Sequence, residues 1–168
     1  MTDFEDLYDR YARDVYRFAL YLSGSKAQAE DIASETFVRV WTLRDSIRAA
    51  SVKSYLFTIA RNLHADARRR QSKSVELPDH LLDPSPSPET EAGDKQSLAF
   101  VLMALQRIPE IDRAALLMRA QDELSYEEIA AALGLSLAAA RVKVHRARLR
   151  IAELRESKTR FPLPRRTS

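Results

Sequence analysis

Residues 72–97 separate two stretches of helical sequence, and this separation restricts the chain to folds built from two parts. The segment holds four of the seven prolines, and six acidic residues against two basic ones. Such a composition cannot bury enough apolar surface to offset the entropy of ordering the chain. We therefore predict an acidic, flexible linker over 72–97. A coil of about 26 residues spans roughly 25–30 Å, so the two parts can bind well-separated positions on one long ligand.

The composition excludes several classes of protein. The chain has 168 residues, of which 45% are hydrophobic and 30% charged, which is typical of a folded, soluble protein. It has no cysteine, so disulfides and thiolate chemistry are excluded. No window reaches the roughly 18 apolar residues of a membrane span, and we expect a cytoplasmic protein. The sequence has no phosphate-binding glycine loop, nucleophile motif or metal cluster, so we expect no cofactor, no metal and no enzymatic activity.

Both flanking segments predict an all-α fold, because apolar residues recur at intervals of three and four. In 1–71 we expect three or four helices. The first ends near Gly24, and the second runs from Ser25 to Trp41 with Ala33, Phe37, Val40 and Trp41 facing inward. A third, long helix carries an apolar stripe made of Val52, Leu56, Ile59, Leu63 and Ala67.

A second stripe on the long helix combines basic and aromatic residues. A projection at 100° per residue places Phe57, Arg61, His64 and Arg68 opposite the apolar stripe. Arginine neutralises phosphates and an exposed aromatic ring stacks on unpaired bases, so this stripe suits single-stranded DNA. A charged, solvated helix surface with one stray phenylalanine would produce the same pattern.

The segment 98–156 contains the pattern of a helix-turn-helix. Ser125 is followed three residues later by Glu128, which predicts a capping box at the start of a short helix. Gly134 then predicts a left-handed turn residue, and Ser136 can cap the next helix. A helix, a three-residue turn and a second helix form the arrangement that inserts its second helix into the major groove.

The second helix of this motif is strongly basic on its predicted outer side. Its apolar stripe consists of Leu137, Ala140, Val144, Ala147, Ile151 and Leu154. The remaining positions carry five basic residues and no acid between 141 and 150, namely Arg141, Lys143, Arg146, Arg148 and Arg150. Flanks of this kind can contact phosphates on both sides of a groove. A basic amphipathic helix can also bind a membrane or an acidic partner, but the capped turn before it favours DNA.

Residues 29–41 and 54–70 closely resemble region 2 of the extracytoplasmic-function (ECF) sigma factors, and residues 105–156 resemble region 4. The resemblance implies two small helical domains, a region 2 bundle over 1–71 and a region 4 helix-turn-helix over 98–156. The linker over 72–97 joins them, and a basic tail follows over 157–168.

The resemblance also implies a function and partners. The chain would bind the clamp and flap of the bacterial RNA polymerase core, recognise the −35 element as duplex and the −10 element as single strand, and assist promoter melting. An anti-sigma factor is a further partner that the resemblance allows. The implied polymerase-binding residues are Glu30, Asp31 and Glu35. Like charges at 31 and 35 mildly destabilise a lone helix, and pairing of Glu35 with Arg39 offsets part of this; a solvated helix face remains an alternative explanation.

The DNA contacts follow from the same resemblance. The loop 45–51 would hold a base turned out of the −10 strand, near the Asn62 amide, which offers both a donor and an acceptor. The implied −10 residues are Ile47, Arg48, Tyr55, Phe57, Arg61, Asn62 and Arg68. The implied −35 residues are Arg141, Val142, Lys143, His145, Arg146, Arg148 and Arg150.

The recognition helix departs from the family pattern at its start. The family commonly has Gly-Thr-Val-Lys-Ser-Arg where this chain has Ala-Ala-Ala-Arg-Val-Lys over 138–143. Alanine and valine can contact thymine methyls but cannot donate a hydrogen bond to guanine. We therefore expect Arg141, His145 and Arg146 to be the polar base readers.

Two other functions fit parts of the sequence. A two-domain helix-turn-helix regulator would need a dimer surface or an effector pocket in 1–71, and we find no motif for either. A sigma-like adaptor that binds an anti-sigma factor without touching DNA should lack the basic and aromatic stripe.

Overall fold

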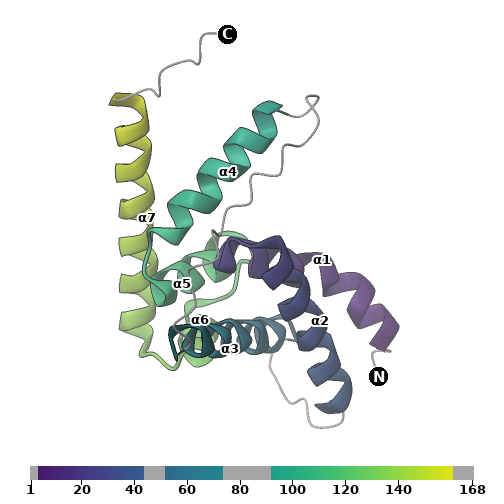
Figure 1. Ribbon diagram of the computed structural model, residues 1–168. Helices are drawn as coiled ribbons and strands as arrows, with labels where there is room; N and C mark the ends of the chain where they lie inside the picture. Colours follow the sequence, from purple (N-terminus) through teal and green to yellow (C-terminus); the bar gives the residue numbers. More distant parts are fainter. Residues whose placement is uncertain (1–3, 44–51, 74–91, 161–168) are drawn as a thin grey trace.

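Seven helices make up the computed structural model, which describes residues 4–43, 52–73 and 92–160 (Figure 1). They are α1 (Phe4–Ser23), α2 (Lys26–Leu43), α3 (Val52–Lys73), α4 (Ala92–Gln106), α5 (Glu110–Ala120), α6 (Tyr126–Leu133) and α7 (Leu137–Arg160). These ranges contain no strand, so the predicted all-α class is confirmed for them. None of the described helices is long and apolar enough to cross a membrane.

The first half of the chain is a bundle of α1, α2 and α3. Helix α1 buries Leu7, Val15, Phe18 and Leu22, which recur on one side of the helix and pack against α2 and α3. Gly24 ends α1 with a φ of 72°, and its N–H donates to the Leu20 carbonyl at 2.7 Å. A left-handed residue at this position suits glycine and closes the helix end.

The second half contains the predicted helix-turn-helix in α6 and α7. The Glu128 N–H donates to Ser125 Oγ at 3.1 Å, so Ser125 caps α6 as expected. Gly134 has a φ of 65° and a ψ of 37°, the left-handed conformation predicted for the turn. The Ala139 N–H donates to Ser136 Oγ at 3.1 Å, which caps α7. The turn is therefore built by Gly134 and Ser136, and the helix before it is started by Ser125, as the sequence pattern indicated.

One apolar core runs through both halves of the chain. Helix α1 contacts α4 and α5, and α3 contacts α6, which Figure 1 shows as α3 lying beside α6 near the centre of the molecule. Buried residues of the first half, such as Phe18 and Phe57, belong to the same cluster as Met118, Ile129 and Val144 of the second. The halves are thus packed on one another and do not stand apart at the ends of a linker.

Several local predictions differ from the structure. Helix α3 continues to Lys73 and α4 begins at Ala92, so helices extend into both ends of the predicted linker, and 74–91 lie outside the described residues. The prediction that Trp41 faces inward is wrong. Trp41 is 49% exposed, because it lies near the outer end of α2. Leu137 was placed on the buried side of the recognition helix and is also wrong, since it is exposed in the first turn of α7.

Candidate nucleic-acid interface

Helix α7 turns a basic face to solvent. Ala140, Val144 and Ala147 are fully buried and seat the helix against α5 and α6. Six of the seven predicted −35 residues are exposed: Arg141, Val142, His145, Arg146, Arg148 and Arg150. An exposed row of cations on the second helix of a helix-turn-helix is the arrangement that contacts a DNA groove and its phosphates.

Two of the basic residues predicted to contact the −35 element, Arg141 and Lys143, also contact side chains of the second half. Lys143 Nζ lies 3.3 Å from Asp112 Oδ1, and the Asp112 side chain is 9% exposed. The Arg141 guanidinium lies 5.6 Å from the centre of the Tyr126 ring, within the range of a cation–π contact. Lys143 therefore also fixes α7 on α5, which the basic pattern alone did not indicate.

The aromatic and basic stripe predicted on α3 is not an open surface. Phe57 is fully buried and packs edge to face on Phe18, with ring centroids 4.8 Å apart. His64 is only 3% exposed. The projection was wrong because α3 is covered on more than one side: α1 and α2 pack against it, and so does α6 from the second half. Its fully buried residues are therefore centred roughly 70° around the helix from the predicted apolar stripe.

Arg61 and His64 meet a carboxylate from the second half. Arg61 donates from Nε to Glu110 Oε1 at 3.1 Å and from Nη2 to Oε2 at 2.9 Å. His64 Nδ1 lies 3.7 Å from Glu110 Oε1. Burial favours the neutral form of Glu110, but the hydrogen bonds and charges of His64 and Arg61 outweigh it and lower the pKa of Glu110 to about 2.

A second carboxylate crosses between the halves at the turn after α5. The Asp122 side chain is fully buried, with Oδ1 3.7 Å from Lys53 Nζ and 3.8 Å from an Arg17 nitrogen. Neither oxygen accepts a hydrogen bond in the described part of the chain. Burial therefore dominates and raises the pKa of Asp122 to about 6, although Lys53 and Arg17 oppose the shift. The sequence patterns identified neither Glu110 nor Asp122, because their partners are far away along the chain.

The other predicted −10 residues lie in different environments. Asn62 and Arg68 are exposed on α3, whereas Tyr55 is partly buried and packs against the core. Ile47 and Arg48 lie outside the described residues. Of the predicted −10 residues on α3, Asn62 and Arg68 are therefore exposed, whereas Arg61 is paired with Glu110. The loop 45–51 lies outside the described residues.

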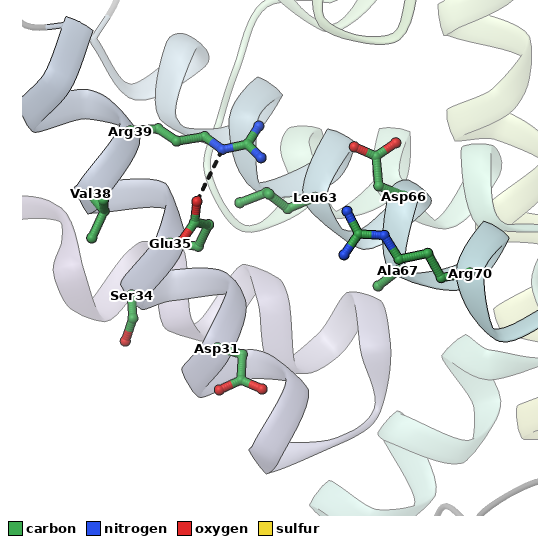
Figure 2. A pocket seen from close by; sticks show the side chains of 9 residues that line it. All are labelled: Asp31, Ser34, Glu35, Val38, Arg39, Leu63, Asp66, Ala67 and Arg70. Atoms are coloured by element: carbon green, nitrogen blue, oxygen red, sulfur yellow. Dashed lines mark hydrogen bonds and ion pairs between the residues drawn. The ribbon is translucent and has the colours of Figure 1, made fainter.

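The predicted polymerase-binding residues face solvent on α2. Glu30, Asp31 and Glu35 are all exposed, and Asp31 and Glu35 line a groove between α2 and α3 (Figure 2). Glu35 Oε1 accepts from Arg39 Nε at 3.3 Å, which is the pairing expected from their spacing. Figure 2 shows Asp66 and Arg70 on the α3 side of the same groove.

An aromatic groove beside this surface was not predicted. Phe4 and Tyr8 of α1 lie against Phe37 and Trp41 of α2, with ring centroids 4.9 Å apart for both Phe4–Trp41 and Tyr8–Phe37. Tyr8, Trp41 and the neighbouring Val38 are about half exposed. The sequence could have indicated this groove, because the apolar residues Phe37, Val38 and Trp41 together cover a wider part of the helix surface than one buried stripe requires.

Comparison with known proteins places two sequence families on the chain. The model of Sigma-70 region 2 matches residues 7–74, and that of Sigma-70, region 4 matches residues 101–151. Within the described residues, no group of three or more potential ligands that could hold a metal ion occurs.

Individual relatives match most of the chain. The ECF RNA polymerase sigma factor SigM of Bacillus subtilis is 32% identical over 155 residues, which cover 89% of this chain and 93% of SigM. SigE of Mycolicibacterium smegmatis is 34% identical over 158 residues, and this chain spans 62% of that protein's length. Among solved structures, RpoE in complex with the anti-sigma factor NepR from Bartonella quintana is similar, with a TM-score of 0.73, 28% identity and coverage of 93% of this chain and 98% of that one.

Proposed function

Because the chain belongs to the ECF RNA polymerase sigma factor family, we propose that it binds core RNA polymerase and directs it to promoters with specific −35 and −10 elements. The single observation that carries this proposal is the capped α6–α7 turn, whose second helix presents an exposed basic face. We further propose that residues 1–71 act as region 2, 98–156 as region 4 and 157–168 as a basic tail.

In the proposed −35 contact, α7 enters the major groove and its exposed cations divide into two groups. Arg141, His145 and Arg146 read base edges, while Arg148 and Arg150 contact phosphates. Lys143 contacts phosphate only by giving up part of its ion pair with Asp112. Val142 is 44% exposed and can contact a thymine methyl.

In the proposed −10 contact, α3 supplies Arg61, Asn62 and Arg68 to the melted strand, together with the loop that contains Ile47 and Arg48. Burial of Phe57 and the packing of Tyr55 argue that these rings position α3 and do not stack on bases. The exposed polar side chain of Asn62 supports a base contact, since an amide can both donate to and accept from a base edge.

The proposed core contact uses the acidic side of α2. Glu30, Asp31 and Glu35 are exposed, and half-exposed Val38 and Trp41 extend this side with apolar surface. A patch that combines apolar and charged groups suits a protein partner. We assign it to the polymerase clamp, and the region 4 half to the flap.

The proposal also covers regulation of the chain and its location in the cell. The likeness to RpoE, whose structure was solved with the anti-sigma factor NepR, supports an anti-sigma factor as a partner of this chain too. We propose a cytoplasmic protein that acts as an initiation factor and has no enzymatic activity of its own, so the chemistry of RNA synthesis belongs to the polymerase.

Run-off transcription tests the proposal. Core polymerase is incubated with a library of promoter fragments, with and without the chain, and transcripts are sequenced. We expect initiation at a defined subset of fragments only when the chain is present. The charge-reversal variant Asp31→Lys/Glu35→Lys is the control for contaminating factors. Initiation that is the same without the chain would contradict the proposal.

A further inference from the structure

Three side chains, one each from α5, α6 and α7, come together beside the start of the proposed recognition helix. The Arg119 guanidinium lies 4.6 Å from the centre of the Tyr126 ring, and the Arg141 guanidinium lies 5.6 Å from the same centre. We propose that Tyr126 is a positioning residue for −35 recognition: its ring orders Arg141 so that the guanidinium reads a guanine at one base pair. This inference rests on the proposed function, because it takes α7 as the helix that enters the major groove.

The Tyr126 ring is itself held by the structure around it. Tyr126 is the first residue of α6, directly after the capping Ser125, and it is partly buried against the apolar core. The neighbouring Arg119 is fixed as well, because its Nη1 donates to the Leu124 carbonyl at 3.0 Å. The ring therefore stands on an ordered helix start beside an anchored cation, which suits it to order a longer side chain.

Contact with the ring orders Arg141 without using its hydrogen-bond donors. A guanidinium is planar and its N–H groups point outward in that plane, so an aromatic face can attract the cation and leave the donors available. Lys143 shows the contrast, because its ammonium is engaged by Asp112 at 3.3 Å. Since Arg141 is exposed on α7, a guanidinium held in this way can still meet a base edge. Ordering a side chain before binding also reduces the entropy that is lost when DNA binds.

The position of Arg141 on the helix indicates what it reads. The four residues before it in α7, over 137–140, are one leucine and three alanines, so Arg141 is the first side chain of this helix that can donate a hydrogen bond. The first residues of a recognition helix contact base edges in the major groove. Arginine pairs with O6 and N7 of guanine through two hydrogen bonds. The chemical target that we assign to the ordered Arg141 is therefore a guanine of the −35 element.

The base preference of the assembled holoenzyme tests this positioning role. Core polymerase and the full chain are assembled on a promoter identified by run-off transcription, and each −35 base pair is replaced in turn by the other three. We expect Arg141→Ala to reduce the preference for guanine at one base pair about fivefold or more. Tyr126→Leu should reduce the same preference about two- to fivefold, and Tyr126→Phe, which keeps the aromatic face, should retain it.

Two controls separate positioning from loss of charge and from loss of packing. Arg148→Ala removes one positive charge of α7 at another exposed position, and it should weaken transcription from all the promoters alike. Tyr126→Leu/Arg141→Ala should have the same base preference as Arg141→Ala alone, because the ring acts through Arg141. Circular dichroism verifies that each variant is folded. If Tyr126→Leu is unfolded, Tyr126→Met, which fills space without an aromatic face, takes its place.

Several outcomes would overturn the inference. One is an unchanged base preference in the variant without the ring, and another is an equal effect of that substitution with and without Arg141, which would mean that Tyr126 only supports the fold. A preference for a base other than guanine, lost in Arg141→Ala, would overturn the assigned target. Failure of the parent chain to initiate at any promoter is a distinct result, because it contradicts the proposed function and this inference with it.

Discussion

Replacement of Arg113 by methionine tests how the two halves and the α4–α5 turn are held together. Arg113 is 3% exposed, and its guanidinium donates to the carbonyls of Leu105 at 2.8 Å, Ile108 at 3.0 Å and Leu22. Burial lowers the pKa of Arg113 to about 10, so it remains charged at neutral pH. Loss of a hydrogen bond from a charged donor costs roughly 1.5–3 kcal/mol. Three such bonds are lost, but methionine also removes the cost of burying the charge, which offsets part of the loss. We therefore expect the free energy of unfolding to decrease by about 3–5 kcal/mol.

Urea unfolding at pH 7, followed by circular dichroism and tryptophan fluorescence, measures this change. Arg107→Met is the matched control, since Arg107 lies in the same α4–α5 turn and is exposed. We expect the control to shift the free energy of unfolding by less than about 0.5 kcal/mol. A loss below about 1 kcal/mol in Arg113→Met would refute the argument that the three carbonyls depend on this side chain.

Three further predictions concern separate surfaces. Asp31→Lys/Glu35→Lys should abolish binding to core polymerase in a pull-down while helical content is unchanged; binding at parental affinity would refute the acidic contact. Arg146→Ala should cost about 1–3 kcal/mol on the best −35 duplex and flatten discrimination at one base pair, whereas Arg148→Ala should weaken all duplexes alike and lower the salt slope by about one; uniform weakening by Arg146→Ala would mean that α7 is rotated in the groove. The pKa of Asp122 is raised from 3.8 to about 6, so the folded chain holds this proton more tightly than the unfolded chain. The free energy of unfolding should therefore fall by about 1–3 kcal/mol as the pH rises from 4 to 6. Urea titrations of Asp122→Asn should lack this fall.

Local structure was predictable from the sequence where neighbouring residues determine it. The capping serines Ser125 and Ser136 and the left-handed Gly134 act within four residues of their partners, so their types and spacing were sufficient. The buried side of α7 was largely correct for the same reason, since Ala140 and Val144 are fully buried. The exposure of the basic residues followed from it.

The packing of the halves was not predictable in this way. A helical projection assigns one buried side per helix, but α3 is contacted by α1, α2 and α6. Phe57 therefore lies in the core, although the projection placed it opposite the apolar stripe. The Arg61–Glu110 ion pair joins residues 49 positions apart, and no local spacing rule connects them. Glu110 lies in the first turn of α5, where an acidic residue is common whatever its partner.

The shared core has a consequence for how the chain is made. Helix α3 ends at Lys73 and its cover α6 ends at Leu133, so about 60 residues must be synthesised after α3 before that cover exists. At roughly 5–20 residues per second on the ribosome, the side of α3 that α6 covers stays exposed for several seconds after α3 is synthesised. During translation the nascent first half thus carries Arg61 without its partner, and only completion of α5 and α6 supplies both Glu110 and the cover on that side of α3.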